Sequence, residues 1–232
     1  MKELLTKFVN LVFENTCLIC NKSSGNLKVC QSCIDDFKER KGNYKKHLSN
    51  ITVYSYGYYD GKLRDGIINL KNGKKKLATY FSQLLVDFWK RLKLNIPGDL
   101  TVIPVPSHKK RIKERGYCQT SLIASNFANS LSLKYSNDLL LRTKNTKHMN
   151  NLEDINKRVE NIKDAFGFSN LQSPTSSAKG GPASGGNLLI IDDIVTSGST
   201  MCEIEKTIHK FNSEVNLFGL TIASGDVWNS SL

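Results

Sequence analysis

The chain has 232 residues, of which 39% are hydrophobic, enough to bury one sizeable core and a small satellite domain. No run approaches the roughly 18 apolar residues that a membrane helix requires, so we expect a cytoplasmic protein with no stable membrane insertion. The formal net charge is +12, and Lys and Arg gather in three stretches, 38–46, 62–76 and 109–115. Such stretches attract nucleic acid or a polyphosphate ligand, although a basic surface that is merely solvated is the plain alternative.

The N-terminal segment contains a short amphipathic pattern and then a cysteine cluster. Residues 1–14 have apolar side chains at helical spacing, and charged residues interrupt any signal-peptide core, so we predict an amphipathic helix. Residues 15–36 contain two Cys-x-x-Cys pairs, Cys17 with Cys20 and Cys30 with Cys33. Two such knuckles present four thiolates to one tetrahedral metal ion. We predict a structural Zn²⁺ site, with disulfides or a redox dithiol as the alternatives.

The next part of the chain begins with a basic connector, 37–50, and continues into an alternating stretch, Ile51–Tyr59, that predicts a strand or hairpin. The tyrosines of this stretch either pack on the core or stack on nucleic-acid bases. A helical pattern at Leu77–Leu92 and an apolar run at Leu100–Val105 predict a helix followed by a strand.

A polar, basic loop is predicted at 104–117, directly after that strand and before a helix at Gln119–Leu131. Arg or Lys donors on a flexible loop can stabilise a highly charged anionic leaving group as it departs. We therefore assign a catalytic role to Arg115, with a mobile, charged surface loop as the alternative.

The C-terminal part alternates helices and strands. An amphipathic helix is predicted at Leu152–Ile162, a flexible insertion at 173–186, a helix at Thr200–Phe211 and a strand at Val215–Ala223. This alternation predicts a doubly wound, mainly parallel α/β sheet with its ligand at the carboxyl ends of the strands. We expect the sheet domain to span 51–228.

The segment Leu188–Thr200 is the most informative in the chain. Four aliphatic residues, which suit a buried strand, run into Asp192 and Asp193, and a cluster of small residues follows: Thr196, Ser197, Gly198, Ser199 and Thr200. Such a cluster at the start of a helix points backbone N–H groups at one anion, and adjacent carboxylates accept hydrogen bonds from a sugar diol. An Asx turn followed by an ordinary helix cap explains either half alone, but not both together.

This segment resembles the phosphoribosyl-pyrophosphate signature of type I phosphoribosyltransferases. The resemblance implies a fold of that kind, with Asp192 and Asp193 facing the ribose 2- and 3-hydroxyls as catalytic residues. It also implies that the loop Thr196–Thr200 holds the 5-phosphate. We expect phosphoribosyl pyrophosphate to bind together with Mg²⁺, which prefers oxygen ligands and substrate phosphates.

Taken as a whole, the chain resembles the ComF family of competence-associated proteins. The resemblance rests on the cysteine pairs, the Asp192–Asp193 signature and these further motifs: Tyr59–Arg64 leading into Leu70-Lys71, Pro104-Val-Pro, Arg115-Gly-Tyr-x-Gln119, Arg158-x-x-Asn161 and Ala165-Phe166. It implies a bacterial cytoplasmic protein that joins a zinc finger to a phosphoribosyltransferase domain and handles incoming single-stranded DNA in natural transformation. On this basis Lys71 is placed in the phosphoribosyl-pyrophosphate site. Other competence proteins, such as a DNA helicase, are possible partners.

The chain departs from the family pattern at two positions, because Cys118 stands where Asn is common and Met149 where Gln is usual. We predict that single-stranded DNA contacts the lysines at 74–76, namely Lys74, Lys75 and Lys76. Two other functions stay open. One is a salvage phosphoribosyltransferase that acts on a nucleobase, and the other is a non-catalytic nucleotide sensor.

Overall fold

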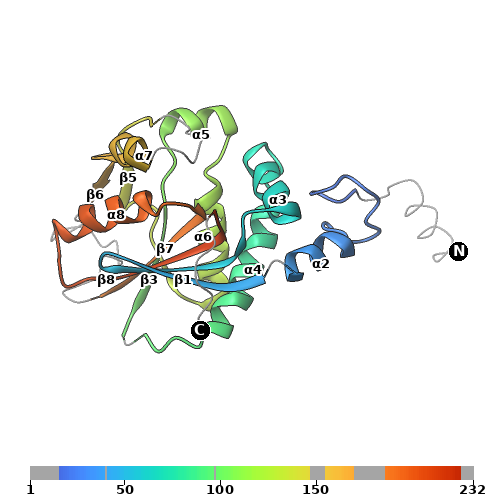
Figure 1. Ribbon diagram of the computed structural model, residues 1–232, viewed down its shortest axis with the longest axis horizontal. Coiled ribbons are helices and arrows are strands. Elements are labelled where there is room, and N and C mark those ends of the chain that lie inside the picture. The colour runs from blue at the N-terminus through green and yellow to red at the C-terminus, as the bar shows by residue number, and fades with distance from the viewer. Residues whose placement is uncertain (1–15, 40, 97, 147–154, 170–185, 226–232) are drawn as a thin grey trace, which may run out of the picture.

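A computed structural model describes residues 16–39, 41–96, 98–146, 155–169 and 186–225. Its centre is a six-stranded sheet in the order β1-β2-β8-β7-β3-β4, in which β1 is the antiparallel edge and the other neighbours are parallel (Figure 1). The elements are α2 (Gln31–Glu39), β1 (Lys41–Leu48), β2 (Ile51–Tyr58), α3 (Gly61–Lys71), α4 (Leu77–Leu92), β3 (Leu100–Pro104), α5 (Lys109–Arg115), α6 (Gln119–Leu131), β4 (Lys134–Tyr135), β5 (Leu140–Arg142), α7 (Ile155–Ile162), β6 (Phe166–Phe168), β7 (Asn187–Val195), α8 (Ser199–His209) and β8 (Asn216–Ser224). No helix in these ranges is both long and apolar enough to span a bilayer.

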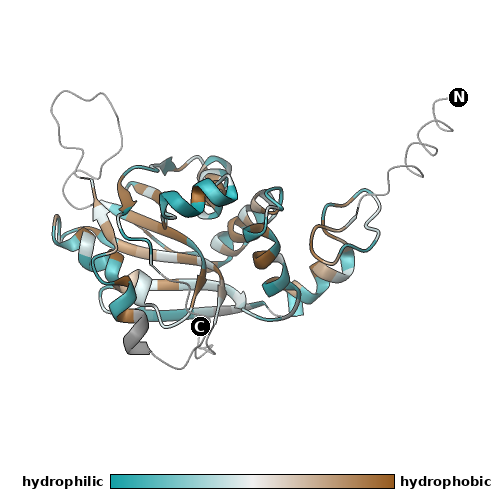
Figure 2. Ribbon diagram, turned by 90° about the horizontal axis from the view of Figure 1, so that it is seen from above, coloured by the Kyte–Doolittle hydropathy of each residue, from teal (hydrophilic) through white to brown (hydrophobic). Residues whose placement is uncertain are grey.

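Strand β7 shows why the sheet is covered on both faces. Successive side chains of a strand point to opposite faces, and here both sets are apolar. Leu189 and Ile191 join the hydrophobic cluster formed with α3, α4 and α6, whereas Leu188 and Ile190 join the cluster formed with α8. Figure 2 shows hydrophobic residues concentrated on these central strands. The predicted doubly wound, mainly parallel α/β architecture is therefore confirmed.

The cysteine-rich module packs directly on this domain. Phe37 of α2 is buried, and its ring lies 6.2 Å from that of Phe81 on α4. Ile19 approaches α3 at Gly66, where an added Cβ would lie 3.3 Å from the Ile19 side chain. The module therefore shares the larger hydrophobic cluster and has no separate core.

Two segments differ from their predicted conformations. The expected connector 37–50 contains the end of α2 and strand β1, which pairs with β2 in a hairpin. The expected loop 104–117 contains helix α5. The imidazole of His108 caps this helix by accepting a hydrogen bond from Lys110 N at 3.3 Å, and Gly116 ends it at φ 81°. The predicted helix 1–14 and nearly all of the insertion 173–186 lie outside the described residues.

A second, smaller sheet stands apart from the main one. Strands β5 and β6 pair antiparallel, from Leu140 opposite Phe168 to Arg142 opposite Phe166. Helix α7 lies beside this pair in Figure 1, and both α7 and β6 pack on α8. The small sheet shares a hydrophobic cluster with α8, and the charge of Arg142 acts on Asp192 of β7.

Candidate functional site

The candidate site is built on the carboxyl end of β7, where ligands bind in open α/β sheets. Asp193 is buried, with 8% of its side chain exposed. Its Oδ2 forms an ion pair with Lys71 Nζ at a distance of 2.8 Å. Asp192 lies next to it, and its Oδ1 accepts a hydrogen bond from the backbone N–H of Asp193 at 2.8 Å. Lys71 comes from the end of α3, so two elements that are distant in sequence meet at the acidic pair.

The two carboxyl groups differ in their affinity for a proton. Burial and the neighbouring charge of Asp193 raise the pKa of Asp192 well above its ordinary value. Burial also opposes ionisation of Asp193, but the ammonium of Lys71 and hydrogen bonds from its neighbours outweigh it, so the Asp193 pKa is lowered. Asp193 is therefore a fixed carboxylate, and Asp192 is the member of the pair whose protonation can change.

Gln119 connects this pair to the basic helix α5. Its amide Nε2 donates to Asp193 Oδ2 at 3.4 Å, and its Oε1 accepts a hydrogen bond from Arg115. The side chains therefore form a continuous chain of contacts, Arg115–Gln119–Asp193–Lys71. The sequence motifs predict Arg115, Asp193 and Lys71 at one site but give Gln119 no role there.

The loop that follows β7 leads directly into α8. Gly198 is the residue before the helix, at φ 84°, and it has no side chain with which to cap the first turn. The Oγ of Ser197 accepts a hydrogen bond from Ser199 N at 3.4 Å and donates to Ser199 Oγ at 3.2 Å. The segment Thr196–Thr200 is thus a tight turn at a helix N-terminus, an arrangement that suits an anion.

Two more arginines converge on one residue, Thr146. Arg111 of α5 donates from Nη2 to the backbone oxygen of Thr146 at 2.6 Å, and Arg142 of β5 donates to the Thr146 hydroxyl. The charge of Arg142 also acts on Asp192. Sequence reasoning missed both residues: Arg111 was one basic residue among several, and Arg142 stood in no motif.

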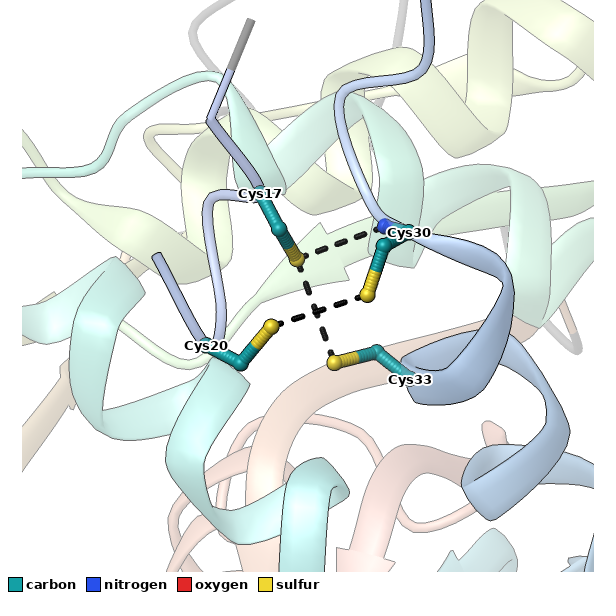
Figure 3. A group of neighbouring side chains, drawn as sticks. All are labelled: Cys17, Cys20, Cys30 and Cys33. Carbon is teal, nitrogen blue, oxygen red and sulfur yellow. Dashed lines mark hydrogen bonds between the residues drawn. The ribbon is translucent and has the colours of Figure 1, made fainter. Parts of the chain in front are cut away.

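The four cysteines of the N-terminal module converge on one point (Figure 3). The Cys17 and Cys33 sulfurs are 3.9 Å apart and the Cys20 and Cys30 sulfurs are 3.6 Å apart. A tetrahedral Zn²⁺ with Zn–S bonds of about 2.3 Å requires sulfurs about 3.8 Å apart, and a disulfide requires about 2 Å. All four cysteines are free thiols, and their arrangement can bind a zinc ion.

Backbone N–H groups also point at the sulfur of Cys17, as expected for metal-binding knuckles. Ile19 N and Cys30 N donate to Cys17 Sγ at 3.4 Å and 3.3 Å. These hydrogen bonds stabilise a negative charge on the Cys17 sulfur, and they therefore favour the thiolate form, which is the form that binds a metal. A hydrogen bond from Ser32 likewise lowers the pKa of Cys30 to about 6.

The residues expected to contact DNA fall into two groups. Lys74, Lys75 and Lys76 line a hollow of about 700 Å³ between the cysteine module and α6, together with Leu18 and Leu122. Tyr54 and Tyr56 are buried in the core, at 5% and 4% exposure, so the stacking interpretation is wrong for these two rings. They lie on the sheet face that α4 covers, and Tyr56 packs edge-on against Phe88.

Comparisons with known proteins agree with this picture over part of the chain. Competence protein F of Haemophilus influenzae is 28% identical over 123 residues, which cover 53% of this chain and 50% of that protein. The DNA utilization protein YhgH of Salmonella typhi is 26% identical over 137 residues, or 58% of this chain and 55% of that protein, and the Escherichia coli K12 protein of the same name is 28% identical over 107 residues. The chain therefore spans about half the length of the curated relatives it matches.

No protein-family model matches the chain. Among solved structures, an adenine phosphoribosyltransferase from Leishmania tarentolae aligns with a TM-score of 0.39 and 10% identity, covering 80% of this chain and 96% of that one. From the sequence matches, the chain is a homologue of competence protein F over about half of its length.

Proposed function

We propose that this protein binds phosphoribosyl pyrophosphate with Mg²⁺ at the carboxyl end of β7 and acts in the handling of incoming DNA. The observation that carries the proposal is the paired acids Asp192 and Asp193, anchored by Lys71 and followed at once by the turn at the start of α8. The turn suits a phosphate and the acids suit a diol, so together they fit a sugar phosphate.

The chemistry follows from the charges at the site. In transfer, the bond between ribose C1 and the pyrophosphate oxygen breaks, a new bond forms between C1 and the acceptor, and pyrophosphate leaves with the bonding electrons. Positive charge develops on the sugar ring, and the carboxylates of Asp192 and Asp193 stabilise it. Arg115, held by Gln119, supplies a cation for the departing pyrophosphate.

The carboxylate oxygens fit magnesium better than a softer metal, because Mg²⁺ prefers oxygen ligands and retains substrate phosphates and waters. Asp192 is the residue that would face it, since Asp193 is already paired with Lys71. The ion supplies charge neutralisation for the pyrophosphate when it is bound.

The DNA-related part of the proposal rests on the relatives and on surface charge. The relatives carry the names competence protein F and DNA utilization protein, and the lysine-lined hollow provides a cationic surface beside the cysteine module. We propose the cytoplasm as its location and single-stranded DNA as its polymeric ligand. We also propose residues 15–36 as a zinc module and 51–228 as the phosphoribosyltransferase-like domain.

Calorimetry with phosphoribosyl pyrophosphate and Mg²⁺ tests the sugar-phosphate site. We expect the wild type to bind the ligand and the double variant Asp192→Asn/Asp193→Asn to lose at least tenfold in affinity. Because a divalent cation favours the ionised form of Asp192, binding should release a proton. The measured heat should therefore change between two buffers of different ionisation enthalpy.

The control variant is Asp99→Asn, which removes an exposed carboxylate at the amino end of β3, the opposite end of the sheet. It should bind like the wild type. A wild type that does not respond to the ligand, or a double variant that binds equally well, would refute the proposed site.

A further inference from the structure

Arg111 and Arg142 form a paired cationic site that the chemistry above does not use. Both guanidinium groups donate to the same buried residue, Thr146, one to its backbone oxygen and one to its hydroxyl. The Arg142 guanidinium also lies 5.3 Å from the centre of the Phe166 ring on β6. The two positive charges are therefore held side by side, between α5 and the small β5–β6 sheet.

Nothing described neutralises this pair by direct contact. Within the described residues, no salt bridge joins either guanidinium to a carboxylate, and Arg142 Nε is buried without a hydrogen-bond partner. Burial lowers the pKa of Arg142 and the charge of Arg111 lowers it further, with partial compensation from Asp192. Burial and the charge of Arg115 likewise lower the pKa of Arg111, with partial compensation from Glu114.

Packing against an aromatic ring does not by itself account for the arrangement of Arg111 and Arg142. Arg91 is an example of an arginine that only packs in this way: its guanidinium lies 5.6 Å from the centre of the Phe88 ring, and burial alone lowers its pKa. Arg142 has a similar ring contact but also faces another arginine. Two guanidinium groups that repel each other in a partly buried place are stabilised when an anion binds between them.

Arginine pairs bind carboxylate and phosphate groups because their N–H donors match the oxygens of these anions. The donor ligand already has other partners in the proposed site, namely the turn before α8 for its 5-phosphate and Arg115 for its pyrophosphate. Arg142, by contrast, belongs to the small sheet, outside the main sheet that holds the sugar. An anion held between Arg111 and Arg142 would contact α5 and the small sheet, whereas the acids and the turn proposed for the sugar phosphate belong to β7 and the start of α8.

We propose that Arg111 and Arg142 bind a carboxylate or phosphate group on the acceptor, so that the acceptor substrate is an anionic molecule. As an acceptor subsite this inference rests on the proposed function, although the anion site itself does not. The pair would select acceptors by charge: an anionic acceptor neutralises the two guanidinium groups, whereas a neutral one of the same shape leaves them repelling each other.

The test uses benzoate and phenyl phosphate as anionic probes and benzamide as the neutral probe of similar shape. Each is titrated by nuclear magnetic resonance into the full chain, with and without saturating phosphoribosyl pyrophosphate and Mg²⁺. We expect at least one anionic probe to bind tenfold or more tightly than benzamide. Arg142→Met and Arg111→Met should each remove most of that tenfold difference, because each variant loses its charge-assisted hydrogen bonds to the anion.

Arg91→Met is the matched control, since it removes an arginine stacked on a phenylalanine elsewhere, and it should leave probe binding unchanged. Arg142→Lys keeps the positive charge but not the planar guanidinium fork, so we expect it to retain part of the anionic-probe binding. Such partial binding would show that the loss in Arg142→Met does not come from unfolding. The affinity for phosphoribosyl pyrophosphate is measured in every variant.

Three results would overturn the inference. Equal binding of benzoate, phenyl phosphate and benzamide would mean that the pair binds no anion. Unchanged probe binding in both arginine variants would place the anion elsewhere. A loss of phosphoribosyl-pyrophosphate affinity in Arg142→Met as large as that of the probes would assign the pair to the donor's pyrophosphate. If the wild type binds the anionic probes but not phosphoribosyl pyrophosphate, the proposed function fails and the anion site remains.

Discussion

At the scale of single residues, the buried acidic pair destabilises the ligand-free protein at one of its two members. Asp193 has Lys71 as its partner, but Asp192 is held beside a second carboxylate with no such compensation at contact distance among the described residues. Functional sites often retain charges that folding alone would not select. The distinction between the two aspartates can be measured without any substrate.

We predict that Asp192→Asn stabilises the ligand-free protein at neutral pH. The pKa of Asp192 is raised in the folded state, so between its unfolded and folded pKa values the native protein binds more protons than the unfolded chain. Stability therefore falls as pH rises through that window, and the variant should not show this loss. A chain of this size gains about 2–4 °C in Tm for each kcal/mol, and thermal melts from pH 5 to pH 8 check the result.

Replacing Lys71 should have the opposite effect on stability and destabilise the folded protein. Lys71→Met leaves the buried carboxylate of Asp193 without its partner, and breaking a buried pair in this way costs about 3–5 kcal/mol. Because the Asp193 pKa is lowered in the folded state, its contribution to stability is present above the unfolded pKa and is lost as pH falls. Equal melting temperatures for Lys71→Met and the wild type at pH 7 would contradict the ion pair.

At the scale of elements, helix α3 links the cysteine module to the site through its last three residues. The Asn69 amide donates to the backbone oxygens of Leu18 and Ile19 at 3.0 Å and 2.9 Å, within the first cysteine knuckle. The backbone oxygen of Leu70 accepts a hydrogen bond from Tyr117, and Lys71 reaches Asp193. The position of Lys71 therefore depends on contacts with the cysteine module.

We predict that removing zinc, or replacing Asn69 by Ala, weakens binding at the sugar-phosphate site. Asn69→Ala leaves two carbonyl oxygens of the knuckle without this donor, at a cost of about 1–3 kcal/mol, and loosens the end of α3. Elemental analysis before and after chelation gives the metal content, and calorimetry gives the ligand affinity. Asn126→Ala removes an exposed hydrogen bond to Thr79 and serves as the control.

If chelation leaves phosphoribosyl-pyrophosphate affinity unchanged, the module does not support the site. If the purified protein contains no stoichiometric metal and its four thiols react freely, the zinc assignment itself is wrong.

At the scale of the whole molecule, some of the excess lysines form ion pairs within the fold and others line a surface hollow. Lys62 pairs with Asp65 at 3.0 Å and Lys71 pairs with Asp193, so part of the basic stretch 62–76 is neutralised within the fold. Lys74, Lys75 and Lys76 are the lysines of this stretch that line the hollow beside the cysteine module. This hollow is therefore the surface at which we expect single-stranded DNA to bind.

We predict that Lys74→Ala/Lys75→Ala/Lys76→Ala weakens single-stranded DNA binding and reduces its dependence on salt. For every DNA phosphate that the variant no longer neutralises, the slope of log affinity against log salt should become shallower by about 0.7. Fluorescence anisotropy at several salt concentrations measures this slope. The control replaces Lys90, Lys206 and Lys210, three exposed lysines on other elements, by alanine. Equal reductions in affinity in the two triple variants would show that only net charge matters.

The sequence by itself determined the parts of the protein that depend on neighbouring residues. Strand β7, the acidic pair, the turn and helix α8 are contiguous, so their order fixes their geometry, and the Cys-x-x-Cys spacing likewise brings thiolates together. Helix α4 was predicted with its observed bounds because its apolar residues repeat at helical spacing, and the predicted bounds of α6 also match the observed ones. Helix α5 was missed because its sequence, KKRIKER, has too little apolar character to show that period.

Only the tertiary structure decided which distant residues meet. Gln119 reaches Asp193, Arg142 lies beside Arg111, and Tyr56 faces the core because strand pairing and helix packing bring separate segments together. The alternation of 51–59 favoured packing on the core but was also compatible with tyrosines that stack on bases, and the covering helix α4 decides for the core at Tyr54 and Tyr56. Local patterns set the elements and the turn before α8, whereas the charges that surround the acidic pair come from long-range contacts, which no local spacing encodes.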